Sequence, residues 1–120
     1  MDSINAILAI GRFGLNVEYT KAYVSSENIK NMAFDSYVGL AVDTRSLSAD
    51  YLSKSGSSLQ KMEYPTAQKI REEYTVANGT TLRHDEEVTK LAEAELRHRV
   101  IAELLSKKMS LVELAVTYKG

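Results

Sequence analysis

The segment 85–108 constrains the fold most, because its apolar residues recur at the spacing of one face of an α-helix. Such a helix has to bury that face against other elements or against another chain. Asp85 can cap the helix, and acidic residues in its first turn and lysines in its last suit the helix dipole. We therefore expect Leu96 and Val100 to be buried and Glu93 and Lys107 to be exposed. The apolar stripe consists of Val88, Ala92, Leu96, Val100 and Leu104, widened by Leu91, Ile101 and Leu105.

A second, shorter helix is expected after a tight connection at Lys108–Met109. Ser110 and Glu113 have the spacing of a capping box, in which each side chain satisfies a backbone N–H of the other residue. This helix is apolar nearly all round, and such helices are normally buried on most sides. A chain of 120 residues buries only a modest core, so we expect a partner surface to supply the cover. The interaction candidates are Leu111, Val112, Leu114, Ala115, Val116 and Tyr118.

Residues 96–118 resemble the opening of a helix-turn-helix unit, and the resemblance rests on Leu104, Leu105, Ser110, Glu113, Leu114 and Ala115. It implies a DNA- or transcription-associated regulator that uses a C-terminal helical hairpin. The sequence stops where the recognition helix of such a unit would begin. The chain has 15 Lys and Arg against 16 Asp and Glu, a balance that argues against strong nonspecific binding of nucleic acid. The candidate phosphate contacts are Arg97, Arg99, Lys107 and Lys108.

The N-terminal third of the chain shows weaker helical patterns. Residues 3–24 favour a helix, and a break is expected at Gly11–Gly14 because an interior Gly costs about 1 kcal/mol relative to Ala. A fresh helix start is expected at Ser25. Its apolar residues continue at helical spacing, but Tyr37–Val42 also fits a strand.

The remaining segments complete an all-α prediction. Tyr64–Pro65 opens a helix that is expected to end at the Asn78–Gly79 pair. The Gly- and Ser-rich sequence at 54–58 predicts a flexible connection. We predict one helical domain over 1–120, with four to five helices in a small bundle or in two helical hairpins. The alternative of a short β-hairpin stays open within 13–42.

Most chemistries find no support in the sequence. The chain has no cysteine, which excludes thiol catalysis, disulfides and Cys-ligated zinc. Two His–carboxylate pairs, His84 with Glu87 and Glu95 with His98, have one-turn spacing, but a helical-bundle metal site needs further ligands. Neither a phosphate-binding loop nor a nucleophile motif occurs. We expect no cofactor and no enzymatic activity, and a small metal-dependent bundle enzyme is the third alternative.

These observations favour a non-enzymatic helical interaction protein that self-associates or docks on a larger protein assembly. Its small, cysteine-free, motif-poor chain is similar in kind to many virus- or phage-encoded accessory and structural proteins. The apolar run at 4–10 lacks a preceding basic region and is too short to span a bilayer, so we expect a soluble, unprocessed, cytoplasmic protein without a membrane partner. The seven tyrosines are expected to divide between core and interface.

Overall fold

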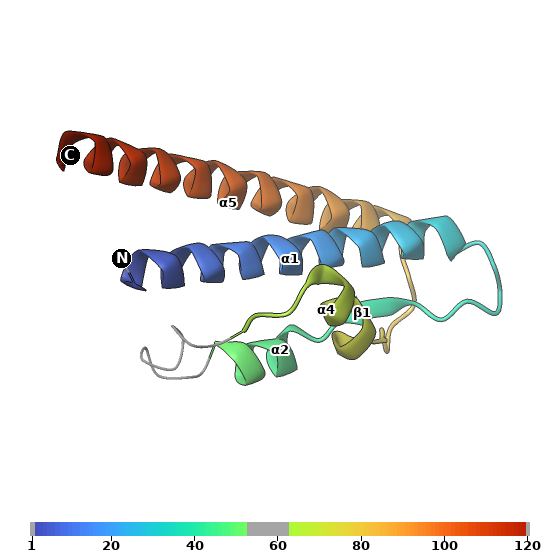
Figure 1. Ribbon diagram of the computed structural model, residues 1–120. Coiled ribbons are helices and arrows are strands. Elements are labelled where there is room, and N and C mark those ends of the chain that lie inside the picture. Colours follow the sequence, from blue (N-terminus) through green and yellow to red (C-terminus); the bar gives the residue numbers. More distant parts are fainter. Residues whose placement is uncertain (1, 53–62, 120) are drawn as a thin grey trace.

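The computed structural model describes residues 2–52 and 63–119 and contains two long helices over a smaller layer (Figure 1). The long helices α1 (Asp2–Asn31) and α5 (His84–Lys119) run antiparallel and side by side along most of their length. The smaller layer packs mainly on α1. It consists of β1 (Leu40–Val42), α2 (Thr44–Tyr51), α4 (Ala67–Tyr74) and β2 (Thr75–Ala77). The prediction of a mainly helical fold is confirmed, and the predicted connection at 54–58 lies outside the described residues.

Helix α1 is continuous, so the predicted break at Gly11–Gly14 and the predicted fresh start at Ser25 are wrong. The two glycines have a packing role instead. A Cβ atom at Gly11 would collide with the side chain of Leu105, and one at Gly14 would lie 3.3 Å from the Cδ1 atom of Ile101. The absence of side chains at these positions lets α1 and α5 approach closely, and that contact offsets the low helix propensity of Gly.

The main apolar core lies between α1 and the smaller layer. Phe13 of α1 packs with Leu47 of α2 and Ile70 of α4, and all three side chains are buried. Three tyrosine rings close the cluster, and the centroids of neighbouring rings, with Phe13 included, lie 5.0–6.3 Å apart. These rings are Tyr51, Tyr64 and Tyr74. Part of the tyrosine content therefore serves the core, whereas Tyr19 is exposed.

The smaller layer contains a short antiparallel strand pair, in which Leu40 lies opposite Ala77 and Val42 opposite Thr75. One strand falls within the range 13–42 where a hairpin was an alternative, but its partner lies beyond α4, so the pairing is long-range. Helix α4 ends at Tyr74 and not at Asn78–Gly79 as predicted. The β-branched residues of β2, Thr75 and Val76, favour the extended conformation and explain this earlier end.

Helix α5 is a single element of 36 residues, and the predicted connection at Lys108–Met109 is wrong. The hydroxyl group of Ser110 donates to the carbonyl oxygen of Ser106 at 3.0 Å, one turn earlier, so Ser110 lies within the helix and caps no new one. No Gly or Pro occurs from His84 to Lys119, and nothing in the sequence therefore forces the backbone to leave the helix. Residues 96–118 therefore do not form the helical hairpin that the helix-turn-helix resemblance implies.

The membrane prediction can be compared with the helices directly. Within 2–52 and 63–119, none of the helices has a stretch that is both long and apolar enough to cross a membrane.

Candidate interaction surface

The predicted apolar stripe of α5 lies on the outside of the molecule. Leu96 is 58% exposed and Val100 is 45% exposed, so the prediction that they are buried is wrong. Glu93 and Lys107 are exposed as predicted. The helix turns a second apolar face toward α1, on which Ala94 is buried and three larger side chains are partly buried. These three are Leu91, Ile101 and Leu105. Helix α5 is therefore apolar on two sides, and only one is covered within the described chain.

The exposed apolar residues of α5 form a line that we call the outer seam. From Val100 onward its members are spaced alternately by four and three residues, the heptad spacing of coiled-coil helices. At about 100° per residue they fall within an arc of roughly 80°, whose centre lies about 120° around the helix from Ala94. Apart from Lys107, the members are 45–63% exposed. The outer seam consists of Leu96, Val100, Leu104, Lys107, Leu111 and Leu114.

The predicted interaction candidates divide between the two faces of α5. Leu111 and Leu114 belong to the outer seam, and a shallow groove runs beside them along Ser106, Lys107 and Ser110. Val112 is half-buried. Ala115 and Val116 are exposed. The side chain of Tyr118 lies outside the described part of the chain.

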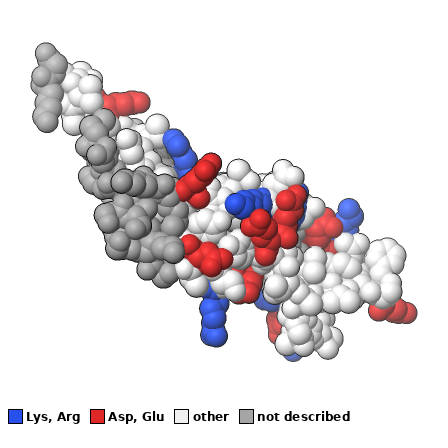
Figure 2. Space-filling view, turned by 60° about the horizontal axis from the view of Figure 1, so that its bottom comes forward, with Lys and Arg blue, Asp and Glu red and all other residues white. Residues whose placement is uncertain are grey.

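The four basic candidates for nucleic-acid contact do not share one face. Arg97 pairs with Glu93 at 3.6 Å, whereas Arg99 lines a groove of about 650 Å³ on the other side of the α1–α5 pair. Lys107 lies in the outer seam and Lys108 is half-buried. Lys and Arg side chains also alternate with Asp and Glu side chains on the face shown in Figure 2. The structure thus brings together no basic patch from these four residues.

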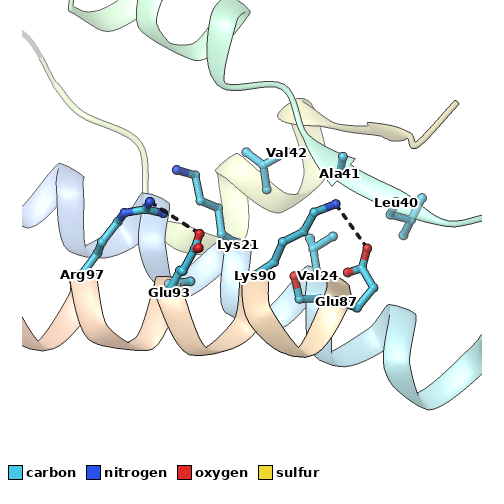
Figure 3. Close-up of a pocket in the computed structure, with 11 residues that line it drawn as sticks. Lys21, Val24, Leu40, Ala41, Val42, Glu87, Lys90, Glu93 and Arg97 are labelled. Atoms are coloured by element: carbon cyan, nitrogen blue, oxygen red, sulfur yellow. Dashed lines mark hydrogen bonds and ion pairs between the residues drawn. The ribbon is translucent and has the colours of Figure 1, made fainter. Parts of the chain in front are cut away.

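A polar cleft lies between α1, α5 and β1 and has a volume of about 210 Å³ (Figure 3). Along the α5 side of the cleft, Lys90 pairs with Glu87 at 3.3 Å and Arg97 pairs with Glu93 at 3.6 Å. Lys21 enters the cleft from α1 (Figure 3). Its ammonium group pairs with Glu18 of the same helix at 3.3 Å. Each cation in the cleft therefore already has a carboxylate partner, which leaves no uncompensated charge to attract an ionic ligand.

A buried polar network at one end of this cleft was not predicted from the sequence. Asn28 is 1% exposed and Glu87 is 2% exposed, and the Asn28 amide group donates to the Glu87 carboxylate at 3.2 Å. The same amide donates to the carbonyl oxygen of Leu40 at 2.8 Å, and its Oδ1 atom accepts from the N–H of Leu40 at 2.9 Å. The Tyr37 hydroxyl group donates to that Oδ1 atom at 2.9 Å.

The environment of Tyr37 favours its neutral form. Burial raises the pKa of the Tyr37 hydroxyl, and the negative charges of Glu27 and Glu87 raise it further. The network therefore joins α1, β1 and α5 through hydrogen bonds that need a protonated tyrosine. Nothing in the linear sequence marks Asn28, because its partners are distant along the chain. We assign this network a structural role.

The structure places the two His–carboxylate pairs in different surroundings. Glu87 points into the buried network whereas His84 is exposed. Glu95 and His98 both line the groove beside Tyr19 and Tyr23. Over the described ranges, no group of three or more His, Asp or Glu side chains is arranged to hold a metal ion.

Comparisons with known proteins add no further candidate for the site. Neither the protein-family models nor the curated proteins nor the solved structures contain a match to this chain.

Proposed function

We propose that the protein is a non-enzymatic interaction protein that self-associates through the outer seam of α5. The observation that carries this proposal is the exposure of a heptad-spaced apolar line on a helix whose other apolar face already packs on α1. Heptad-spaced apolar residues are the pattern by which one helix packs into another. Leu104 is 61% exposed and Leu111 63%, so the seam offers large side chains that water now surrounds.

Burial of the seam would supply a driving force for association. Each large apolar side chain contributes about 1.5–3 kcal/mol when it is fully removed from water. Contiguous exposed apolar surface of this kind is typical of protein–protein interaction sites. The nucleic-acid alternative would need a basic patch, and the four basic candidates do not share one face. Self-association through an apolar seam does not depend on such a patch.

Sedimentation equilibrium of the full chain at micromolar concentrations tests the proposal. We expect an oligomer for the unmodified protein and a monomer for Leu104→Glu, which places a charge in the middle of the seam. Val88→Glu is the matched control, because Val88 is also an exposed apolar residue of α5 but lies outside the seam. It should leave the association unchanged. A monodisperse monomer for the unmodified chain at tens of micromolar would contradict the proposal.

A further inference from the structure

The Asn78–Gly79 pair does not end a helix, and it lies in an exposed loop instead. Asn78 follows β2 directly, and its backbone N–H donates to the carbonyl oxygen of Gly39 at 2.7 Å. Gly79 and Thr80 are exposed. In an Asn-Gly sequence the second backbone nitrogen reaches the side-chain amide carbon with least hindrance, because glycine has no Cβ atom. The pair therefore has the elements of an intramolecular reaction.

The loop that contains this pair is fixed at both ends and open in its middle. At one end Asn78 bonds to Gly39. At the other end Leu82 packs on the same residue, since a Cβ atom at Gly39 would lie 2.6 Å from the Cδ2 atom of Leu82. Between these ends, a Cβ atom at Gly79 would meet no other atom within 4 Å, and no described residue accepts a hydrogen bond from the Gly79 N–H. The fold therefore leaves the nitrogen of Gly79 able to react.

The side chain of Asn78 is held and polarised by Thr80. The Thr80 hydroxyl group donates to the Asn78 Oδ1 atom at 2.9 Å. When a nucleophile adds to the amide carbon, negative charge develops on this oxygen, and a hydrogen-bond donor directed at it stabilises the transition state. Thr80 therefore lies where a donor assists the addition.

The four other asparagines of the chain lack this arrangement. All four lie in α1, and the residue after each is Ala, Val, Ile or Met. The side chain of that next residue hinders the approach, and inside an α-helix its backbone N–H is also bonded to a carbonyl group one turn earlier. These four are Asn5, Asn16, Asn28 and Asn31. They serve as internal controls for the reactivity of Asn78.

We propose that Asn78 is a site of spontaneous covalent modification, at which the backbone nitrogen of Gly79 converts the side-chain amide to a succinimide with assistance from Thr80. The nitrogen of Gly79 forms a bond to the Cγ atom of Asn78, and the bond from Cγ to the amide nitrogen breaks. The proton of the Gly79 N–H leaves with that nitrogen as ammonia. A water molecule then opens the ring at either carbonyl carbon and leaves aspartate or isoaspartate at position 78.

The products differ from the original chain in charge and in backbone length. Either product adds one negative charge to a chain whose formal net charge is −1. Isoaspartate also adds one atom to the main chain, between the two contacts with Gly39 that fix the loop. Residues 79–81 have to accommodate this longer backbone, or one of the two contacts is lost.

Peptide mapping of the full chain after incubation at mildly alkaline pH tests the proposal. Trypsin cleaves after Arg71 and Arg83, so the peptide 72–83 contains Asn78 and none of the other asparagines. We expect this peptide to divide into its original form and two products, each heavier by the exchange of an amide NH2 group for OH and separable by chromatography. The peptides that contain the other asparagines should stay unchanged. Gly79→Ala should abolish the conversion over the same period.

Thr80→Val tests the assisting hydroxyl group, and Thr81→Val is the matched control, because Thr81 is also exposed but does not bond to Asn78. Thr80→Val should slow the conversion in the folded protein about two- to tenfold, the effect of one lost hydrogen bond. Thr81→Val should leave the rate unchanged. In the synthetic peptide 72–83, which lacks the fold, the two substitutions should have the same effect.

Three results would overturn the proposal. The first is a peptide 72–83 that stays unmodified while the full chain is incubated. The second is an equal rate of conversion in folded Thr80→Val and folded Thr81→Val. The third is a slowing by Thr80→Val in the synthetic peptide as large as that in the folded protein, because the folded loop would then not be its source.

Discussion

Asn28 binds Leu40 as a neighbouring β-strand would, donating to its carbonyl oxygen at 2.8 Å and accepting from its N–H at 2.9 Å. One side chain of α1 thereby satisfies both backbone groups of a residue in β1. Buried backbone groups without partners are costly, so this contact fixes where β1 lies against α1.

Replacement of Asn28 should therefore be among the most damaging single changes in the chain. Asn28→Ala leaves Leu40, Tyr37 and Glu87 short of hydrogen bonds in a buried site, and we expect a loss of about 2–4 kcal/mol in the free energy of unfolding. Asn31→Ala is the control, because the Asn31 side-chain amide donates to Glu27 one turn earlier in the same helix. Urea unfolding monitored by circular dichroism measures both. If Asn28→Ala lowered the free energy of unfolding no more than Asn31→Ala does, the Asn28 network would not contribute substantially to stability.

Truncation should destabilise the protein much more at Ile70 than at Leu96. Ile70 is 0% exposed, and Ile70→Ala should cost about 2–5 kcal/mol in the free energy of unfolding. Leu96 is 58% exposed, and Leu96→Ala should cost less than about 1 kcal/mol in the monomer. The measurement needs dilute protein, at which association does not contribute. Equal losses for the two variants would contradict the placement of Leu96 on the outside.

The contact between Gly11 and Leu105 predicts a compensating pair of substitutions. Gly11→Leu fills the space through which α1 and α5 approach, and overpacking of this kind costs about 1–3 kcal/mol. Gly11→Leu/Leu105→Ala removes the colliding side chain and should recover part of that loss. Arg12→Leu controls for the added apolar residue, because Arg12 is exposed on the same helix. Thermal unfolding of the unmodified protein and the three variants measures these effects. A double variant no more stable than Gly11→Leu would contradict the close approach of α1 and α5.

Tyr74 predicts a loss of stability at high pH. Its hydroxyl group bonds to the Asp50 carboxylate at 2.5 Å, and this bond, followed by burial, raises the Tyr74 pKa well above its ordinary value of 10.0. The folded state therefore holds this proton more tightly than the unfolded state does. The stabilisation is fully present below about pH 10 and is lost as pH rises through the folded-state pKa.

The test is the free energy of unfolding between pH 9 and pH 12. It should fall with pH in the unmodified protein and fall less steeply in Tyr74→Phe, which has no ionisable hydroxyl. Tyr19→Phe serves as the control because its ring is 55% exposed and is not part of the tyrosine cluster. The same slope in Tyr74→Phe and the unmodified protein would exclude Tyr74 as the source.

Helical content was predictable from the sequence because it depends on local spacing. Glu93 and Arg97, for example, are four residues apart, which is the spacing at which opposite charges meet on a helix, and they pair at 3.6 Å. The covered face of α5 was not predictable, since apolar residues lie on two sides and periodicity does not say which side packs. The small side chain of Ala94 gives no indication in the sequence that it is a core residue, yet it is buried whereas Leu96 is exposed.

The candidate surface was predictable in part for the same reason. Leu111 and Leu114 were identified as interaction candidates from their apolar surroundings, whereas Leu96 and Val100 of the same seam were predicted to be buried. The heptad spacing of the outer seam can be recognised only once α5 is known to be continuous, because a break at Lys108–Met109 would end that spacing. The contacts of Asn28 and the pairing of β1 with β2 depend on residues far apart in the chain.

The placement of the core implies an uneven resistance to local opening along α5. Across the described positions after Ala94, no residue of α5 is fully buried, although the helix continues to Lys119. Backbone amides in this half should exchange with deuterium through small fluctuations, whereas those near Ala94 should exchange only when the whole domain unfolds. Association through the seam would slow exchange in the C-terminal half of α5 and so reduce the difference in exchange rate between the two halves. The exchange rates in that half would then depend on the protein concentration.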